Sequence, residues 1–145
     1  MERLFEFAGN HPFLSGGIIV AAVLVFVNET RIRMRSVFAI SPFDAVRLLN
    51  RGAAVVDIRD AARFGAGHIA DASNVTPDDL ASHVAGKIKA KKPVLLVCEN
   101  GALSGRYAAA IRKAGRDNAF SLKGGLVAWQ QENLPTQGPS ESGDA

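Results

Sequence analysis

The chain has a single cysteine, Cys98, in 145 residues. One cysteine forms no disulfide within the chain and no cysteine-based zinc cluster, and it fits a reducing compartment. The three histidines are far apart in sequence, and no internal repeat is present. The net charge of +3 is small, and the basic residues are not clustered with aromatic ones, so nucleic-acid binding has little support. We therefore expect no metal ion, no cofactor and no nucleic-acid partner.

One long segment near the N-terminus carries no charge. Residues 7–28 contain no Asp, Glu, Lys or Arg, and residues 13–27 are apolar apart from Ser15, Gly16 and Gly17. About 20 helical residues cross a hydrocarbon core about 30 Å thick. The sequence therefore predicts a short membrane-spanning helix that begins near Pro12 or earlier.

The alternatives for this segment are a signal peptide and a buried core helix. A signal peptide starts with positive charge, whereas the side chains of residues 1–6 here carry a net negative charge. Residues 37–39 form only a weak cleavage site. The apolar run is followed by Arg31, Arg33 and Arg35, which should stay on the cytoplasmic side. We predict an uncleaved, single-pass anchor in a bacterial inner membrane, with the N-terminus facing out and everything after residue 35 in the cytoplasm.

Residues 40–136 alternate between strand-like and helical patterns. Ser41, followed by Pro42 and Asp44, predicts a capped helix that ends at Gly52. The other expected helices are 61–64, 77–88, 106–114 and the segment after 125; the expected strands are 53–58, 71–74 (strand or turn), 93–97 and 119–122. Buried apolar strands that alternate with helices indicate an α/β fold with a mostly parallel sheet covered by helices on both faces.

The composition divides the chain into three parts. Residues 1–36 are the predicted anchor with its basic juxtamembrane segment, and residues 37–136 are the α/β domain. Residues 137–145 are rich in Ser, Gly and acidic residues, and we expect a disordered tail there.

Cys98 closes the most strand-like run of the chain. A short loop with Gly101, Ser104 and Gly105 follows, and then the helix expected at 106–114. Loop N–H groups and the positive end of a helix dipole favour a thiolate. The alternative is that Cys98 is a small apolar residue at the end of a core strand. Its position alone leaves both interpretations open.

Four sequence blocks occur in a characteristic order. They are VVDIR at 55–59 with Phe64, GHIADA at 67–72 with Asn74, VLLVC at 94–98 with Gly101 and Ser104, and LKGGLVAW at 122–129. Together they make the chain resemble the rhodanese-like, single-domain sulfurtransferase family over about residues 37–136. The resemblance implies a rhodanese-like parallel sheet flanked by helices, here preceded by one N-terminal transmembrane helix.

The resemblance also implies a chemistry. In active members the cysteine takes the outer sulfur of a donor such as thiosulfate and becomes a persulfide, and a thiol acceptor then removes that sulfur. Cys98 would have this role. The substrate-binding loop would consist of Glu99, Asn100, Gly101, Ala102, Leu103 and Ser104. Its N–H groups would stabilise the bound anion or persulfide.

Asp57 and Arg59 follow a strand at the edge where open α/β sheets place their sites. A structural role is favoured for both, with Asp57 accepting backbone N–H bonds and Arg59 pairing with an acid. They are auxiliary site candidates, as is Arg106, which could reach the mouth of the loop or lie in solvent. His68 is interpreted as a structural hydrogen-bonding residue.

The loop departs from the family pattern in its charge. Active members usually carry arginine just after the cysteine or at the sixth loop position, where this chain has Glu99 and Leu103. Like charges about 5 Å apart repel by about 3 kcal/mol at an effective dielectric near 20, and less when solvated. A protein persulfide or a less charged donor therefore fits better than thiosulfate. A cysteine phosphatase needs arginine six positions after the cysteine, where Ser104 stands, so that class is excluded.

Three functions remain open at this point. The first is a membrane-anchored sulfurtransferase that uses a sulfur donor and a thiol acceptor. The second is a non-catalytic rhodanese-like module, tethered by residues 7–28, that binds other proteins. The third is a redox-sensing thiol.

Overall fold

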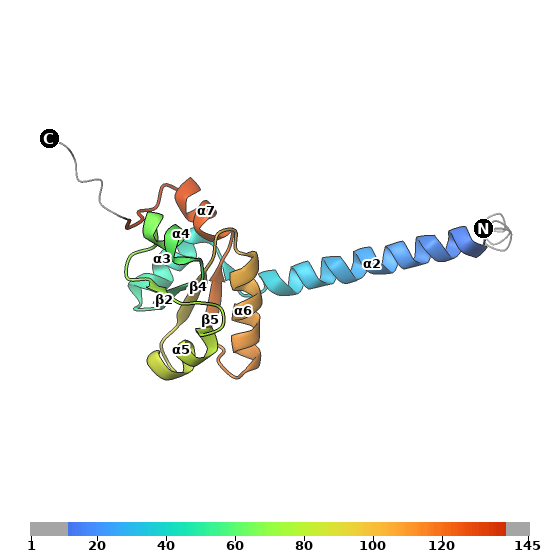
Figure 1. Cartoon of the computed structure of the whole chain (residues 1–145). Helices are drawn as coiled ribbons and strands as arrows, with labels where there is room; N and C mark the ends of the chain where they lie inside the picture. Colours follow the sequence, from blue (N-terminus) through green and yellow to red (C-terminus); the bar gives the residue numbers. More distant parts are fainter. Residues whose placement is uncertain (1–11, 139–145) are drawn as a thin grey trace. The chain divides into compact units, whose positions relative to one another are not determined.

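The computed structural model describes residues 12–138, with side chains described for residues 12–30 and 37–138. The chain divides into two compact units, residues 1–34 and residues 35–145 (Figure 1). Residues 7–11 of the predicted anchor and 139–145 of the predicted tail lie outside the described residues.

The first unit is dominated by helix α2, Pro12–Ser36. Its segment Pro12–Thr30 is long and apolar enough to cross a membrane, and no part of that segment is buried by the rest of the chain. Phe13 is 95% exposed. The Thr30 hydroxyl donates to the carbonyls of Phe26 and Val27, at 3.0 and 2.9 Å, so it stays satisfied within the helix. By length and composition, this helix is a candidate membrane span.

The second unit is built on a five-stranded parallel sheet in the order β1-β5-β4-β2-β3. The strands are β1 (Ala39–Ile40), β2 (Ala54–Asp57), β3 (Ser73–Asn74), β4 (Val94–Val97) and β5 (Ala119–Leu122). The helices are α3 (Pro42–Asn50), α4 (Ala61–Ala66), α5 (Leu80–Lys87), α6 (Ala102–Lys113) and α7 (Gly125–Gln131). Because all strands run the same way, the sheet has one carboxyl edge, where the strands end, and one amino edge, where they begin.

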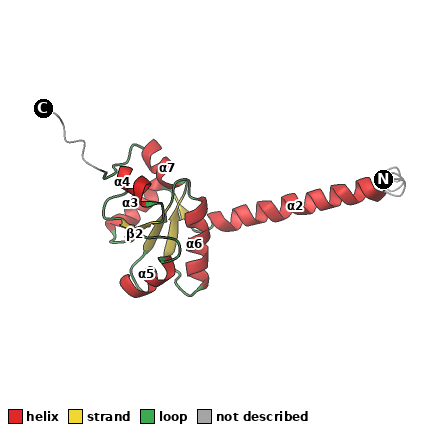
Figure 2. Ribbon diagram, in the orientation of Figure 1, coloured by secondary structure: helices red, strands yellow, loops and turns green. Residues whose placement is uncertain are grey.

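Helices cover both faces of the sheet (Figure 2). On one face, α5 and α6 pack against Val94 and Leu96 of β4. On the other, α3 and α7 pack against Leu95 and Val97. Successive side chains of a strand point to opposite faces of the sheet, so the continuous apolar run of β4 contributes to both cores. This confirms the predicted parallel sheet with helices on both faces.

Several helix and strand boundaries differ from the sequence prediction. The two-residue edge strand β1 was not anticipated, and α5 begins at Leu80 rather than at Pro77. Helix α6 begins at Ala102, four residues earlier than expected, so the end of the predicted loop is its first turn. Gln137, assigned to the tail, exchanges two backbone hydrogen bonds of 2.7 Å with His68.

Candidate functional site

Cys98 follows the last residue of the central strand β4, at the carboxyl edge. Its Sγ accepts hydrogen bonds from the backbone N–H groups of Gly101, at 3.2 Å, and Ser104, at 3.3 Å. In the thiol form, Sγ donates to the Ser104 hydroxyl at 3.3 Å, and that hydroxyl donates to the Gly101 carbonyl at 3.3 Å. The loop therefore directs two N–H dipoles and one hydroxyl group at the sulfur.

The loop closes tightly because Gly101 adopts a left-handed backbone with φ of +84°. A Cβ at this position would lie 2.9 Å from both the Gly124 nitrogen and the Leu122 oxygen. The Asn100 side chain accepts the Ala102 N–H at 3.1 Å and supports the start of α6. Glycine is required here by both the dihedral angle and the lack of space.

The start of α7, which follows β5, is hydrogen-bonded to the backbone at the beginning of this loop. The carbonyls of Cys98 and Glu99 accept the N–H groups of Leu126, at 2.9 Å, and Val127, at 3.1 Å. A Cβ on Gly125 would overlap those same two carbonyls at 2.4 Å, and its φ is +61°. Because these carbonyls are bound to the first turn of α7, they point away from the sulfur, and the N–H groups of the loop are left to face it.

The cysteine side chain is nevertheless buried. Cys98 is 4% exposed, and it belongs to the apolar cluster on the α5–α6 face. Ser104 is fully buried beside it. Cys98 thus closes a core strand, while its sulfur lies among polar groups of the loop.

Asp57 and Arg59 form a buried pair at the same edge. The Asp57 carboxylate is fully buried and accepts the Arg59 backbone N–H at 3.0 Å and the guanidinium at 2.8 to 3.1 Å. The guanidinium also donates to the Gly67 carbonyl at 2.6 Å. Burial alone would lower the pKa of Arg59, but the hydrogen bonds and charge of Asp57, and then of Glu99, outweigh it, so the pKa of Arg59 is raised.

Glu99 is not an isolated negative charge. One carboxylate oxygen lies 3.5 Å from Arg59 Nη1 and 4.0 Å from Arg63 Nη1. Arg63 also pairs with Asp60 at 3.4 Å. Sequence reasoning missed Arg63, which comes from α4 and reaches the loop only in the folded chain. Its spacing of three residues from Asp60 was the only available signal.

The remaining sequence candidates lie farther out. Asn100, Ala102 and Leu103 are exposed, Leu103 at 38%. Arg106 is exposed on α6, and the described contacts do not bring it to the sulfur. His68 stacks on Phe64, and its Nδ1 lies 2.9 Å from the Phe64 carbonyl, which is a structural arrangement.

The family model of the rhodanese-like domain matches residues 41–132. The chain belongs to the rhodanese-like domain family. It is 36% identical over 138 residues to the uncharacterized protein YibN of Escherichia coli K12, covering 93% of this chain and 96% of that one. It is 32% identical over 99 residues to the thiosulfate sulfurtransferase GlpE of Actinobacillus pleuropneumoniae, covering 68% of this chain and 91% of that one.

Solved structures agree on the fold. The polysulfide-sulfur transferase homodimer of Wolinella succinogenes superposes with a TM-score of 0.66 at 22% identity, over 82% of this chain and 91% of that chain. At this level of identity the likeness concerns the fold alone.

A cavity of about 430 Å³ opens beside the loop of this rhodanese-like domain. It is lined by Arg59, Arg63, Ala66, Gly67, Glu99 and Gln130. Its charged groups are paired with one another, so it offers no free cluster of positive charge to a dianion. Among the described residues no group of three or more His, Cys, Asp or Glu side chains could hold a metal ion.

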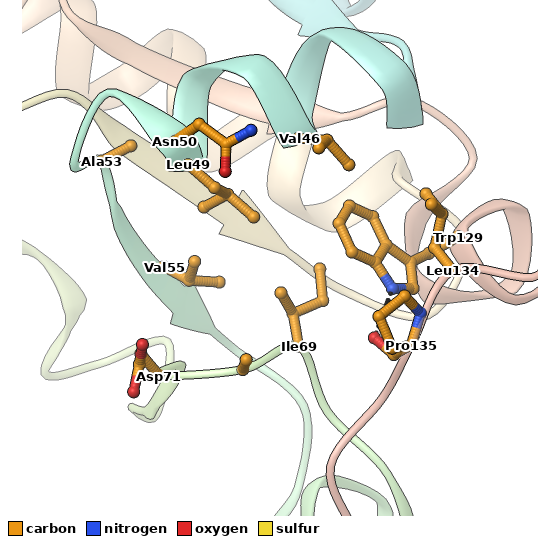
Figure 3. A pocket seen from close by; sticks show the side chains of 11 residues that line it. Val46, Leu49, Asn50, Ala53, Val55, Ile69, Asp71, Trp129, Leu134 and Pro135 are labelled. Atoms are coloured by element: carbon orange, nitrogen blue, oxygen red, sulfur yellow. Dashed lines mark hydrogen bonds between the residues drawn. The ribbon is translucent and has the colours of Figure 1, made fainter.

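A second cavity of about 370 Å³ lies on the α3–α7 face (Figure 3). Its walls are mainly apolar, with Val46, Leu49, Ile69 and Trp129 around it and Asp71 at one end. The Trp129 indole N–H donates to the Pro135 carbonyl at 3.0 Å, so the ring is fixed. We call the loop of residues 99–104 that follows Cys98 the cysteine loop. Cys98 packs with the core of the opposite face, so this cavity is separate from the cysteine loop.

Proposed function

We propose that the chain is a membrane-anchored sulfurtransferase that carries sulfane sulfur as a persulfide on Cys98. The observation that supports it best is the pair of backbone N–H groups, from Gly101 and Ser104, that point at Sγ. Such fixed dipoles stabilise a thiolate, and later a persulfide anion, without reorganisation. The relative named as a thiosulfate sulfurtransferase is consistent with this chemistry.

The reaction has two displacement steps. The Cys98 thiolate attacks the outer sulfur of the donor, a new S–S bond forms, and the donor's own bond to that sulfur breaks. The electron pair leaves with the rest of the donor, as sulfite when the donor is thiosulfate. An acceptor thiolate then attacks the outer sulfur of the persulfide, and Cys98 leaves as a thiolate. The Ser104 hydroxyl accepts from the thiol and can turn to donate to the anion.

A non-catalytic, membrane-tethered binding module is the second candidate. The burial of Cys98 to 4% exposure and the acidic residue next to it favour this function. The two candidates separate in a transfer assay with full-length protein, a panel of donors and an excess of a thiol acceptor. Sulfur transfer that depends on Cys98 supports the enzyme. The absence of transfer from thiosulfate, polysulfide and a protein persulfide would support the binding module instead.

Neutralising Glu99 should favour thiosulfate as a donor. Glu99→Gln removes a negative charge beside the loop, and Arg63 then keeps Asp60 as its acidic partner but no longer faces a second carboxylate. Because Glu99 is 45% exposed, the gain is screened, and we expect kcat/KM for thiosulfate to rise roughly three- to tenfold. The rate with an uncharged organic trisulfide should not change.

Asp117→Asn is the matched control, because it removes one exposed carboxylate at the other edge of the sheet. An equal rise in both variants would point to the net charge of the protein. An unchanged rate in Glu99→Gln would show that the charge of this loop does not limit thiosulfate.

The anchor is part of the proposal. The length and composition of Pro12–Thr30 support it, and the match to the Escherichia coli relative covers 93% of the chain, so it includes most of this helix. The three arginines at 31, 33 and 35 favour a cytoplasmic location for the domain, in a bacterial inner membrane.

Deletion of residues 1–30 should move the protein from the membrane fraction to the soluble fraction. The physical reason is that this deletion removes the whole apolar span, and about 20 apolar residues are needed to hold a chain in the bilayer. Fractionation with an alkaline wash measures the shift. Retention of the shortened protein in washed membranes would contradict the anchor.

A further inference from the structure

The end of α5 and the segment that follows it, up to β4, carry the densest positive charge of the domain. We call this stretch the lysine loop, and its four lysines are Lys87, Lys89, Lys91 and Lys92. All four are exposed, and none forms an ion pair with any residue in the described part of the chain. Lys87 is the last residue of α5, where its positive charge interacts favourably with the helix dipole. The other three lysines lie beyond the helix, so the dipole does not explain why they are there.

The backbone of the lysine loop is held rigidly. The Arg116 guanidinium donates to the carbonyls of Val84, Ile88, Lys89 and Lys92 at 2.8 to 3.0 Å. The Asn118 amide donates to the carbonyls of Ala90 and Lys92 at 2.9 and 3.1 Å. Because these bonds fix the main chain, the ammonium groups project from a preformed surface rather than from a flexible segment.

A groove runs along this surface. It has a volume of about 760 Å³, and Lys87, Lys89 and Lys92 line it together with His83. Asp71 is the only acidic residue among its lining residues. The groove therefore favours an anion, and its floor includes the starts of strands β2 and β3, at Ala54 and Ser73.

The topology of the sheet places the lysine loop and the start of the domain at the same edge. The lysine loop leads into the first residue of β4, and the chain enters the sheet through Ala39, the first residue of the parallel strand β1. Both therefore lie at the amino edge, whereas Cys98 follows β4 at the carboxyl edge. Between the apolar segment Pro12–Thr30 and β1 lie only residues 31–38, which are the end of α2 and two further residues. Even fully extended, they would span no more than about 30 Å.

We propose that the lysine loop is a docking surface for anionic phospholipid headgroups. This inference rests on the proposed anchor, since the short connection keeps the amino edge near the bilayer that the helix would cross. Basic residues so close to an anionic leaflet are attracted to it, and the attraction is lost beyond a screening length. Docking through the amino edge leaves the cysteine loop at the edge that faces away from the lipid, open to soluble donors and acceptors.

The test uses full-length protein in vesicles, with Cys98→Ser so that a single new cysteine can be labelled. A fluorophore on Lys91→Cys reports on the lysine loop, and a fluorophore on Ala102→Cys reports on the carboxyl edge. Quenching by headgroup spin-labelled lipid is compared between vesicles of phosphatidylcholine and vesicles that also contain phosphatidylglycerol. We expect quenching at Lys91→Cys to be about twofold or more stronger in the anionic vesicles, and quenching at Ala102→Cys to be weak in both.

Neutralising the remaining lysines, in Lys87→Gln/Lys89→Gln/Lys92→Gln, should remove the added quenching, and so should salt at about 1 M, where the screening length falls to about 3 Å. Equal quenching in the two kinds of vesicle, or added quenching that survives both treatments, would overturn the docking surface. Co-sedimentation is measured on the same samples. Protein that sediments with neither vesicle contradicts the anchor and the docking surface together, whereas protein that sediments with both but shows no difference contradicts the docking surface alone.

Discussion

Cys98→Ser should reduce sulfur transfer by a factor of about 1,000 or more with every donor, because the loop then lacks the only nucleophilic sulfur of the chain. A serine oxygen forms no persulfide, and the backbone dipoles that face it have no thiolate to stabilise. The measurement is kcat/KM in the transfer assay, under conditions where the wild-type rate is proportional to protein.

The same variant should keep its fold. Serine has nearly the size of cysteine, and its hydroxyl can accept the N–H groups of Gly101 and Ser104 that the sulfur accepts. Thermal unfolding should therefore change little. A variant that unfolds near the wild-type temperature yet retains more than about a tenth of the activity would show that the transfer does not pass through Cys98.

Gly125→Ala should destabilise the domain by about 3 kcal/mol or more and disorder the cysteine loop. Gly125 has a φ of +61°, and a Cβ there would lie 2.4 Å from the backbone oxygens of Cys98 and Glu99. These atoms belong to the main chain, so relief of the overlap needs a shift of the loop itself. Denaturant unfolding measures the stability, and the sulfur-transfer rate reports on the geometry of the loop.

Gly52→Ala is the matched control. Gly52 has a similarly positive φ of +86°, but nothing lies within 4 Å of the position its Cβ would take. The substitution therefore carries the backbone strain without the overlap, and we expect a loss of about 1 kcal/mol with little change in the sulfur-transfer rate. Equal losses of stability in the two variants would contradict the view that Gly125 is needed because its backbone lies against the carbonyls of Cys98 and Glu99.

The sequence predicted those parts of the fold that local chemistry specifies. Ser41 caps α3 through its side chain, with Pro42 at the first helical position. The apolar run ending at Val97 forms a strand buried on both faces. The edge strand β1 has only two residues, too few for any periodicity. It forms because the carbonyls of Phe38 and Ile40 accept the N–H groups of Ser121, in β5, and of Lys123, directly after it.

The parts that could not be predicted depend on contacts between distant segments. The sequence predicted a negative charge beside the cysteine from Glu99 alone. In the fold, Arg59 and Arg63, which belong to another segment of the chain, form ion pairs with the Glu99 carboxylate. Arg116 is part of no recognisable sequence motif, although its guanidinium donates hydrogen bonds to four backbone carbonyls of a segment about thirty residues away. The first turn of α6 extends into the predicted loop because the Gly105 N–H bonds to the Gly101 carbonyl at 3.1 Å.

Sulfur transfer through Cys98 requires its sulfur to be accessible and reactive despite its 4% exposure. Intact-mass spectrometry of the full-length protein after incubation with a sulfur donor tests it most directly. We expect a gain equal to the mass of one sulfur atom, located on the peptide that contains Cys98, reversed by a thiol and absent from Cys98→Ser. An unchanged mass after thiosulfate, polysulfide and protein persulfide would contradict it.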